Sequence, residues 1–316
     1  DRSVSRGLGD VYKRQIYDCA YCINRRSNDL PRATLSVSEL VELTIEFYRR
    51  NYIEGLFLSS GVVRSPDYTM ERLVRVAKDL RQVHRFNGYI HLKSIPGASR
   101  ELVNEAGLYA DRLSVNVEIP KEENLKLLAP EKDHKSVFAP MKYIQQGVLE
   151  SKEERQKFRH APRFAPAGQS TQMIVGATSE SDKDILYLSS ALYGRPTMKR
   201  VYYSGYVSVN TYDTRLPALK QPPLVRENRL YQADWLLRFY QFKVDEIVDD
   251  AYPDLDLEID PKLSWALRHP EQFPVDINKA DYEMLLRVPG IGVKSAKLIV
   301  ASRRFSRLGF YESVSY

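Results

Sequence analysis

The chain has 316 residues, of which 43% are hydrophobic and 28% are charged, and its formal net charge is +6. These fractions are typical of globular proteins, and no apolar run approaches the roughly 18 residues of a membrane span, so we predict a soluble protein without a membrane partner. The N-terminus lacks the pattern of a secretory signal, and we therefore expect a cytoplasmic location and reduced thiols. The length accommodates one large core and a small appended module.

The first 15 residues show neither a helical nor a strand period. We expect residues 1–15 to be non-native or disordered. Regular patterning starts at Ile16, where a loop with two cysteines leads into a polar stretch. A helix follows, which Ser36 can cap with Glu39 three residues later.

Strand-like and helix-like segments then alternate along the chain. This alternation predicts an α/β architecture with a parallel sheet. We expect strands at 56–59, 89–94, 112–119, 172–178 and 200–209, and helices at 70–83, from residue 99 onward, and at 184–193.

Two of the expected strands carry polar side chains on one face. His91 and Lys93 share a face of one strand, and Ser114, Asn116 and Glu118 share a face of another. Strands buried between helices on both sides are apolar on both faces, so these polar faces indicate a wet or liganded interior, as in a full or partial barrel. The alternative is that one of these strands is a solvent-facing edge.

The rest of the chain divides into three further parts. Residues 150–168 are charged and contain proline, which indicates a loop, and prolines become frequent after residue 215. We predict a barrel domain over residues 16–215, a linker or helical extension over 216–271 with a helix at 232–242, and a small all-α module over 272–310 that is truncated or altered near its end.

The two cysteines, Cys19 and Cys22, form a C-x-x-C pair. This spacing is found in half of a zinc site, in a thioredoxin-like redox pair and in iron–sulfur cluster ligation. Zinc requires two more soft ligands, and the five histidines are scattered. A redox pair is expected at a helix N-terminus, which the polar residues after Cys22 do not favour.

The loop resembles the radical S-adenosylmethionine (SAM) signature C-x-x-x-C-x-aromatic-C, with Tyr21 as the aromatic residue. In that signature three thiolates hold a 4Fe-4S cluster, whose fourth iron binds SAM. The first position departs from the pattern, because Gln15 stands four residues before Cys19. We interpret residues 1–15 as foreign sequence that replaced the first cluster ligand, so that only Cys19 and Cys22 remain as metal ligands.

The segment from Tyr17 to Asp29 is similar to the cysteine loop of the DNA modification/repair radical SAM proteins, and the similarity runs from about Ile16 to Phe305. The resemblance implies a partial (β/α)6 TIM-like barrel, a 4Fe-4S cluster and SAM as cofactors, and an electron donor protein as a partner. It also implies that a set of residues binds the cofactor: Tyr21, Ser59, Ser60 and Gly61, then Asn116 and Glu118 toward the ribose, and Val175 and Gly176 toward the adenine. The alternative is that the Ser-Gly segment is an ordinary turn and that the Val-Gly segment is plain core.

A helix–glycine turn–helix pattern follows near the C-terminus, in which Asn278 can cap the first helix and Ala296, Ile299 and Val300 face inward in the second. The sequence from Leu286 to Ala296 resembles a helix-hairpin-helix, in which backbone N–H groups beside the glycines bind a DNA phosphate. The residues from Lys294 to Arg307 include five basic and no acidic side chains. We predict non-sequence-specific DNA binding through Pro289, Gly290, Ile291, Gly292, Val293, Lys294, Ser295 and Lys297.

These features together predict a radical SAM enzyme that acts on DNA, in repair or in modification. Two alternatives remain open. In the first, the chain is a non-catalytic DNA-binding scaffold. In the second, it is a copy of the enzyme that is inactive because Gln15 replaces the first cluster cysteine. A C-x-x-C oxidoreductase explains the cysteine loop alone.

Overall fold

The computed structural model describes residues 4–5, 15–30 and 34–309. It contains two compact units. Unit 1 comprises the described residues up to Thr178 together with 192–222, and unit 2 comprises 179–191 and the described residues from Pro223 onward. The prediction of a non-native stretch over residues 1–15 falls largely outside the described residues, as does most of the expectation for the chain end.

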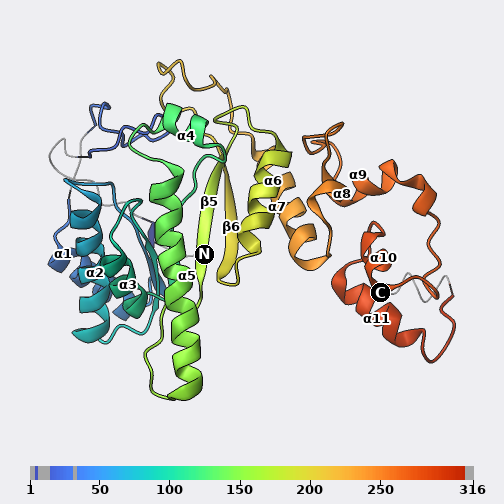
Figure 1. Ribbon diagram of the computed structural model, residues 1–316, viewed down its shortest axis with the longest axis horizontal. Helices are drawn as coiled ribbons and strands as arrows, with labels where there is room; N and C mark the ends of the chain where they lie inside the picture. Colours follow the sequence, from blue (N-terminus) through green and yellow to red (C-terminus); the bar gives the residue numbers. More distant parts are fainter. Residues whose placement is uncertain (1–3, 6–14, 31–33, 310–316) are drawn as a thin grey trace. The chain divides into compact units, whose positions relative to one another are not determined.

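Unit 1 is built around a parallel sheet whose strands follow one another in sequence order, β1 to β6 (Figure 1). The order contains no reversal, so the sheet is singly wound, as in a barrel, rather than doubly wound. The prediction of a parallel α/β fold is confirmed. The strands are β1 (Val4–Ser5), β2 (Gly55–Leu58), β3 (Tyr89–Lys93), β4 (Arg112–Ser114), β5 (Gln169–Val175) and β6 (Met198–Gly205).

Helices connect these strands and form a layer along the sheet, in which α2 packs against α1 and α3, and α3 packs against α5. The register places Leu56 beside Ile90 and Leu92 beside Leu113, and all four side chains are buried. Their face of the sheet is therefore the hydrophobic core of unit 1. The helices of unit 1 are α1 (Val37–Arg49), α2 (Pro66–Gln82), α3 (Arg100–Tyr109), α4 (Glu122–Leu128) and α5 (His134–Lys157). Helix α6 (Asp182–Tyr193) follows β5 in the chain and belongs to unit 2 except for its last two residues.

The other face of the sheet carries the polar side chains that the sequence indicated. Ser114, Asn116 and Glu118 are each less than 9% exposed, and the His91 ring lies 3.5 Å from the Ser170 hydroxyl. The prediction of a polar interior is thereby confirmed for this part of the sheet. Burial, together with the charges of Arg112 and Lys93, lowers the pKa of His91 to about 4, so this imidazole is neutral at physiological pH.

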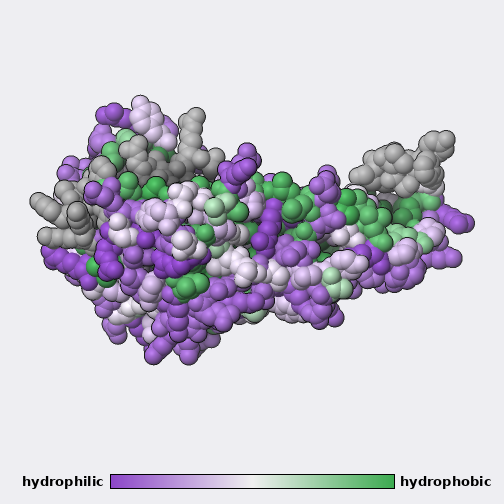
Figure 2. Space-filling model, turned by 90° about the horizontal axis from the view of Figure 1, so that it is seen from above, coloured by the Kyte–Doolittle hydropathy of each residue, from purple (hydrophilic) through white to green (hydrophobic). Residues whose placement is uncertain are grey.

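In the described residues, unit 2 consists of most of α6 and of five further helices and a 3-10 turn: α7 (Leu224–Phe239), α8 (Val244–Ile247), α9 (Pro261–Arg268), the 3-10 turn η1 (Pro270–Gln272), α10 (Tyr282–Arg287) and α11 (Val293–Ser302). A small core joins the last two helices, with Leu285 and Leu286 of α10 packed against Ala296 and Ile299 of α11. The inward positions predicted for the second helix are confirmed for these two residues. The face drawn in Figure 2 is mostly hydrophilic, with scattered hydrophobic patches.

Three local predictions were wrong. The expected loop at 150–168 is helical as far as Lys157, because α5 continues through a fully exposed charged run that has no apolar period. The strand expected over 112–119 ends at Ser114, and Glu118 has a φ of 64° that interrupts the regular ladder. Helix α10 is capped by Asp281, not by Asn278, whose side chain instead bonds the backbone of Leu308.

Candidate functional site

A cavity of about 310 Å³ lies in unit 1 at the carboxyl ends of β2, β3 and β4. Its wall combines the cysteine loop with the residues that follow each of these strands. The carboxyl ends of parallel strands are the usual ligand site in α/β proteins, and the volume falls within the roughly 300–1,000 Å³ of small-molecule pockets. The lining residues are Gln15, Tyr17, Cys19, Tyr21, Cys22, Asn24, Ser59, Ser60, Gly61, Val62, Val63, Lys93, Ser94, Ile95, Pro96, Asn116, Glu118 and Lys132.

The cysteine loop presents two free thiols to this cavity, with Cys19 buried and Cys22 partly exposed. The backbone N–H of Cys22 donates to the carbonyl of Cys19 at 2.9 Å, and that of Ala20 donates to the carbonyl of Leu128 at 2.6 Å. These bonds form a tight turn that is attached to the end of α4. Burial raises the pKa of the Cys19 thiol, and the nearby Lys132 ammonium opposes that shift.

Gln15 occupies the position where a third cysteine would complete the loop pattern. Its backbone forms an antiparallel bridge with Val63, and its side chain lies against Gly61, with Oε1 2.9 Å from the point that a Cβ on Gly61 would occupy. Oε1 is buried and accepts no hydrogen bond. A buried carbonyl oxygen without a donor is unfavourable, by about 1–3 kcal/mol. Gln15 is therefore a poor fit to its surroundings.

A buried ionic group forms the polar wall of the cavity. The Glu118 carboxylate lies 3.7 Å from the Lys93 ammonium and 3.7 Å from the Lys132 ammonium. Its backbone is fixed by a 3.0 Å hydrogen bond from the Glu118 N–H to the carbonyl of Gln172 on β5. Burial alone would raise the pKa of Glu118, but the two lysines lower it below its ordinary value. The carboxylate is therefore ionised at neutral pH.

Lys132 connects this group to the cysteine loop. Its ammonium donates to the Tyr21 hydroxyl at 3.3 Å and lies 5.7 Å from the centre of the Tyr21 ring. Burial opposes the charge of Lys132, but its interactions with Tyr21, Cys19 and Glu118 raise its pKa above the ordinary value. Burial raises the pKa of Tyr21, which keeps the phenol protonated. The cavity thus contains a permanent cation beside the thiols.

The structure brings eight of the predicted site residues to one cavity, and two lie elsewhere. Val175 is fully buried in β5, and its carbonyl accepts a hydrogen bond from the backbone N–H of Tyr206 at 2.8 Å. Gly176 follows it with a φ of 84°. Neither residue lines the cavity. Those that do are Cys19, Tyr21, Cys22, Ser59, Ser60, Gly61, Asn116 and Glu118.

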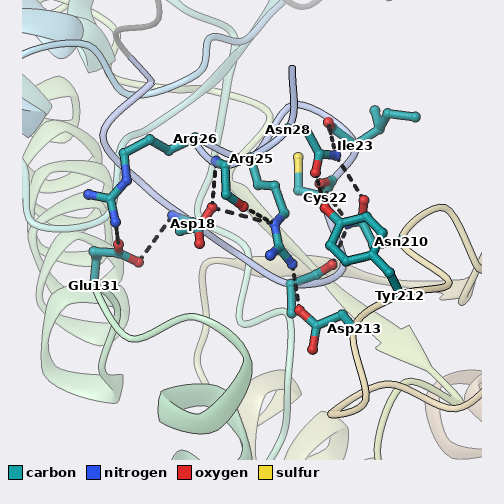
Figure 3. Close-up of polar contacts among 12 residues, drawn as sticks. Asp18, Cys22, Ile23, Arg25, Arg26, Asn28, Glu131, Asn210, Tyr212 and Asp213 are labelled. Carbon is teal, nitrogen blue, oxygen red and sulfur yellow. Dashed lines mark hydrogen bonds and ion pairs between the residues drawn. The ribbon is translucent and has the colours of Figure 1, made fainter. Parts of the chain in front are cut away.

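Sequence reasoning missed two groups of residues around the site. Lys132 follows α4 in a short polar segment with no motif, and nothing local indicates that its side chain is buried. Asn210 and Asp213 follow β6, and they bond the cysteine loop across separations of 182 to 190 residues (Figure 3). The polar residues of the loop itself, including Arg25 and Asn28, were the only available signal, because they need buried partners.

The predicted DNA-binding residues form a separate feature in unit 2. Helices α10 and α11 are joined by the turn 288–292, in which Gly290 has a φ of 85° that favours glycine, and an added Cβ there would meet open space. Gly292 is the N-cap of α11 and supplies no side-chain cap. Lys294 and Lys297 are exposed on the following helix. The turn region thus presents backbone and two cations to solvent.

Within the described residues, no group of three or more histidine, cysteine, aspartate or glutamate side chains is arranged to hold a metal ion. A helix long and apolar enough to cross a membrane is likewise missing from the part of the chain that the structure describes.

Comparisons with known proteins relate unit 1 to one enzyme superfamily. The model of the Radical SAM superfamily matches residues 16–148. A structure of HydG, a maturase of the FeFe-hydrogenase, is 13% identical with a TM-score of 0.52, covering 73% of this chain and 48% of HydG. A search of the curated proteins found no match.

Two further structures are similar at lower scores. Coproporphyrinogen III oxidase (HemN) from Escherichia coli, described as a radical SAM enzyme, is 14% identical with a TM-score of 0.40, and the match covers 69% of this chain and 49% of HemN. HydG from Carboxydothermus hydrogenoformans is 13% identical with a TM-score of 0.41, and the match covers 92% of this chain and 80% of that HydG chain. The chain spans about half the length of the first two structures that it matches.

Proposed function

We propose that the chain is a form of a radical SAM enzyme that acts on DNA, starting from the match of the Radical SAM superfamily model to residues 16–148. Enzymes of this superfamily use a 4Fe-4S cluster and SAM. The observation that carries the proposal is the single cavity that joins both cysteines to Ser59, Gly61, Asn116 and Glu118. Thiols and polar groups thus converge at the carboxyl ends of parallel strands.

The residues present do not fit the complete cluster. Three thiolates hold the cluster in the signature that the loop resembles, and the described chain offers Cys19 and Cys22. Gln15 stands in the third position and leaves its Oε1 buried without a donor. This orphaned oxygen indicates that the surroundings of position 15 are suited to another side chain. We infer that a cysteine at position 15 completes the site and that the chain with Gln15 is inactive.

The polar wall of the cavity suits the zwitterionic and sugar portions of SAM. Glu118 is an ionised acceptor held between two lysines, and it would accept hydrogen bonds from ribose hydroxyls. The segment 59–61 follows β2 directly and lines the cavity, where it would bind the methionyl amino group. Asn116 adds an amide beside Glu118. We do not assign the adenine to Val175 or Gly176, which lie away from the cavity.

DNA as the substrate is supported by the turn between α10 and α11. The glycines at 290 and 292 lie directly before α11, where a phosphate would be favoured by the backbone N–H groups of the first turn and by Lys294 and Lys297. Such contacts read the DNA backbone and not the base sequence. We propose that this helix-hairpin-helix module delivers DNA to the radical SAM domain. The alternative of a DNA-binding scaffold rests on the same turn.

The enzymatic proposal is tested with the Gln15→Cys protein, reconstituted anaerobically with iron and sulfide and then given SAM and dithionite. In this superfamily the reduced cluster supplies the electron that cleaves SAM. We expect 5'-deoxyadenosine to form, to disappear in a Gln15→Cys, Cys22→Ser control, and to increase when duplex or single-stranded DNA is added. A reconstituted protein that binds DNA and never cleaves SAM would support the scaffold and overturn the enzymatic reading.

The DNA contact predicts a specific salt dependence. Each phosphate contact from a lysine contributes about 0.9 to the slope of log K against log salt for duplex DNA. We expect Lys294→Gln and Lys297→Gln each to lower that slope by about one and to weaken binding to all sequences alike. The measurement is fluorescence anisotropy on two unrelated duplexes over a range of salt. Lys157→Gln, on the exposed end of α5, is the matched control, and equal slopes in all proteins would exclude this contact.

A further inference from the structure

The segment that follows β6 bonds the backbone of the cysteine loop through one buried side chain. The Asn210 amide nitrogen donates to the carbonyl of Ala20 at 2.5 Å and to the carbonyl of Cys22 at 3.1 Å. The Asn210 amide oxygen accepts from the Asn28 side chain at 2.8 Å. Asn210 is 1% exposed, and its side-chain amide nitrogen and oxygen both have partners in the loop. One side chain therefore fixes the carbonyls on both sides of Tyr21.

An ionic contact reinforces this attachment (Figure 3). The Arg25 guanidinium donates to the Asp213 carboxylate at 2.6 Å, and both side chains are buried. Arg215 donates to the same carboxylate and to the carbonyl of Leu127 at 3.0 Å. Hydrogen bonds from Arg215 and from Arg25 hold the pKa of the Asp213 carboxyl well below its usual range, against the effect of burial. Asp213 is therefore ionised at neutral pH and links the loop to the end of α4.

These contacts surround the loop from two sides. The end of α4 holds the backbone N–H of Ala20 through the Leu128 carbonyl, and the segment after β6 holds the carbonyls of Ala20 and Cys22. Tyr212 completes the contact, since its hydroxyl donates to the Asn28 side chain and its ring lies 5.5 Å from the Arg25 guanidinium. The loop is thereby held by polar bonds from residues that lie far away in the sequence.

We propose that residues 210–215 are a clamp that holds the Cys19–Cys22 loop in one conformation, with both thiols at the cavity, and that Asn210 and Asp213 are positioning residues. The proposal deepens the proposed function and rests on it, because it concerns the same thiols. Its physical basis is preorganisation: a loop that is already ordered loses less conformational entropy when both thiols bind one ion. Asn210 and Asp213 do not reach the thiols themselves, and they act through the backbone and through Arg25.

The first arm of the test uses the chain as it exists, with no metal. Asn210→Ala, Asn210→Asp and Asp213→Asn are compared with Glu105→Gln, which breaks the exposed 2.9 Å pair with Lys78 in the same unit. We expect amide hydrogen exchange at residues 17–28 and iodoacetamide alkylation of buried Cys19 to become about tenfold faster or more in the three clamp variants, and to stay unchanged in the control.

The second arm measures cadmium binding to the same proteins through the sulfur-to-cadmium charge-transfer absorption. A merely structural role for Asn210 predicts that the truncation Asn210→Ala is the more damaging change. The clamp predicts the opposite, because Asn210→Asp conserves the shape but places a carboxylate oxygen against two carbonyl oxygens. We expect cadmium affinity to fall about tenfold or more in Asn210→Asp, to fall less in Asn210→Ala, and to be recovered in part by Asn210→Gln, which retains the amide donor.

The outcomes separate the clamp from the proposed function. Faster exchange together with weaker cadmium binding supports the clamp, even if the Gln15→Cys protein never cleaves SAM. Exchange, alkylation and cadmium affinity that match the Glu105→Gln control would overturn the clamp, even if SAM cleavage is observed. A uniform fall in the melting temperature of all three variants, with cadmium affinity unchanged in the folded protein, would also overturn it, since it would show a structural contribution alone.

Discussion

Replacing Glu118 with glutamine is expected to destabilise the protein by about 3–5 kcal/mol at neutral pH, because it leaves two lysines at the cavity wall without their shared counter-charge. Lys132 is 10% exposed and Lys93 is 31% exposed, so water cannot fully replace the carboxylate around either ammonium. The measurement is urea unfolding followed by circular dichroism. Glu105→Gln serves as the control, since its pair with Lys78 is exposed and contributes little.

The same carboxylate gives the stability a predicted pH dependence. The pKa of Glu118 is lowered in the folded state, so its contribution is fully present above the unfolded value of about 4.3 and is lost as the pH falls through the folded pKa. We therefore expect the difference between the original protein and Glu118→Gln to be largest near pH 7 and to shrink in acid.

A second variant still tests the prediction if the Glu118→Gln protein does not fold. The double replacement Glu118→Gln, Lys132→Met removes the carboxylate together with the more deeply buried lysine, and we expect it to recover much of the lost stability. A single variant as stable as the Glu105→Gln control would show that water or other groups already solvate the two lysines, and that the ionic group does not hold the cavity wall.

The parallel fold and half of the site were predictable because their signals are local. Alternation placed Leu113, Ser114 and Asn116 on opposite faces of one strand, and the structure buries the polar face in the interior of unit 1. The capping box of Ser36 and Glu39 is present as expected. The cysteine spacing marked the loop that forms one wall of the cavity. Each of these features depends on residues fewer than ten positions apart.

The other site residues depend on contacts between positions far apart in the sequence, which no local sequence pattern indicates. Asn210 and Asp213 bond loop residues more than 180 positions away, so this role emerges only when β6 lies in place. Lys132 reads as an ordinary surface lysine, and only the fold places it beside Tyr21 and Glu118. The exposed end of α5 was taken for a loop because a solvated helix turn needs no apolar residue. The adenine role of Val175 stays a prediction, and the structure buries this side chain in β5, outside the cavity lining.

Of the single substitutions considered, Gln15→Cys is expected to change function the most, because it supplies the third thiolate. Gln15 is aimed at the cavity beside Gly61, with an amide oxygen that has no donor. A cysteine there is shorter, removes the orphaned oxygen and supplies a sulfur in the position that the loop pattern requires. We expect Gln15→Cys to raise the iron retained after anaerobic reconstitution and desalting from well below stoichiometric to about four iron and four sulfide per chain.

Two control variants separate the effect of adding a thiolate from the effect of removing the glutamine. Gln15→Ser also shortens the side chain but gives no thiolate, so it should relieve the buried oxygen and regain stability without retaining the cluster. Gln15→Cys combined with Cys19→Ser restores the count of two thiolates and should lose the iron again. The outcome is measured by iron and sulfide analysis, by the visible absorption of the cluster, and by the loss of that absorption when a chelator is added. Equal iron in Gln15→Cys and Gln15→Ser would mean that position 15 is not a ligand position and that the missing thiolate must come from elsewhere.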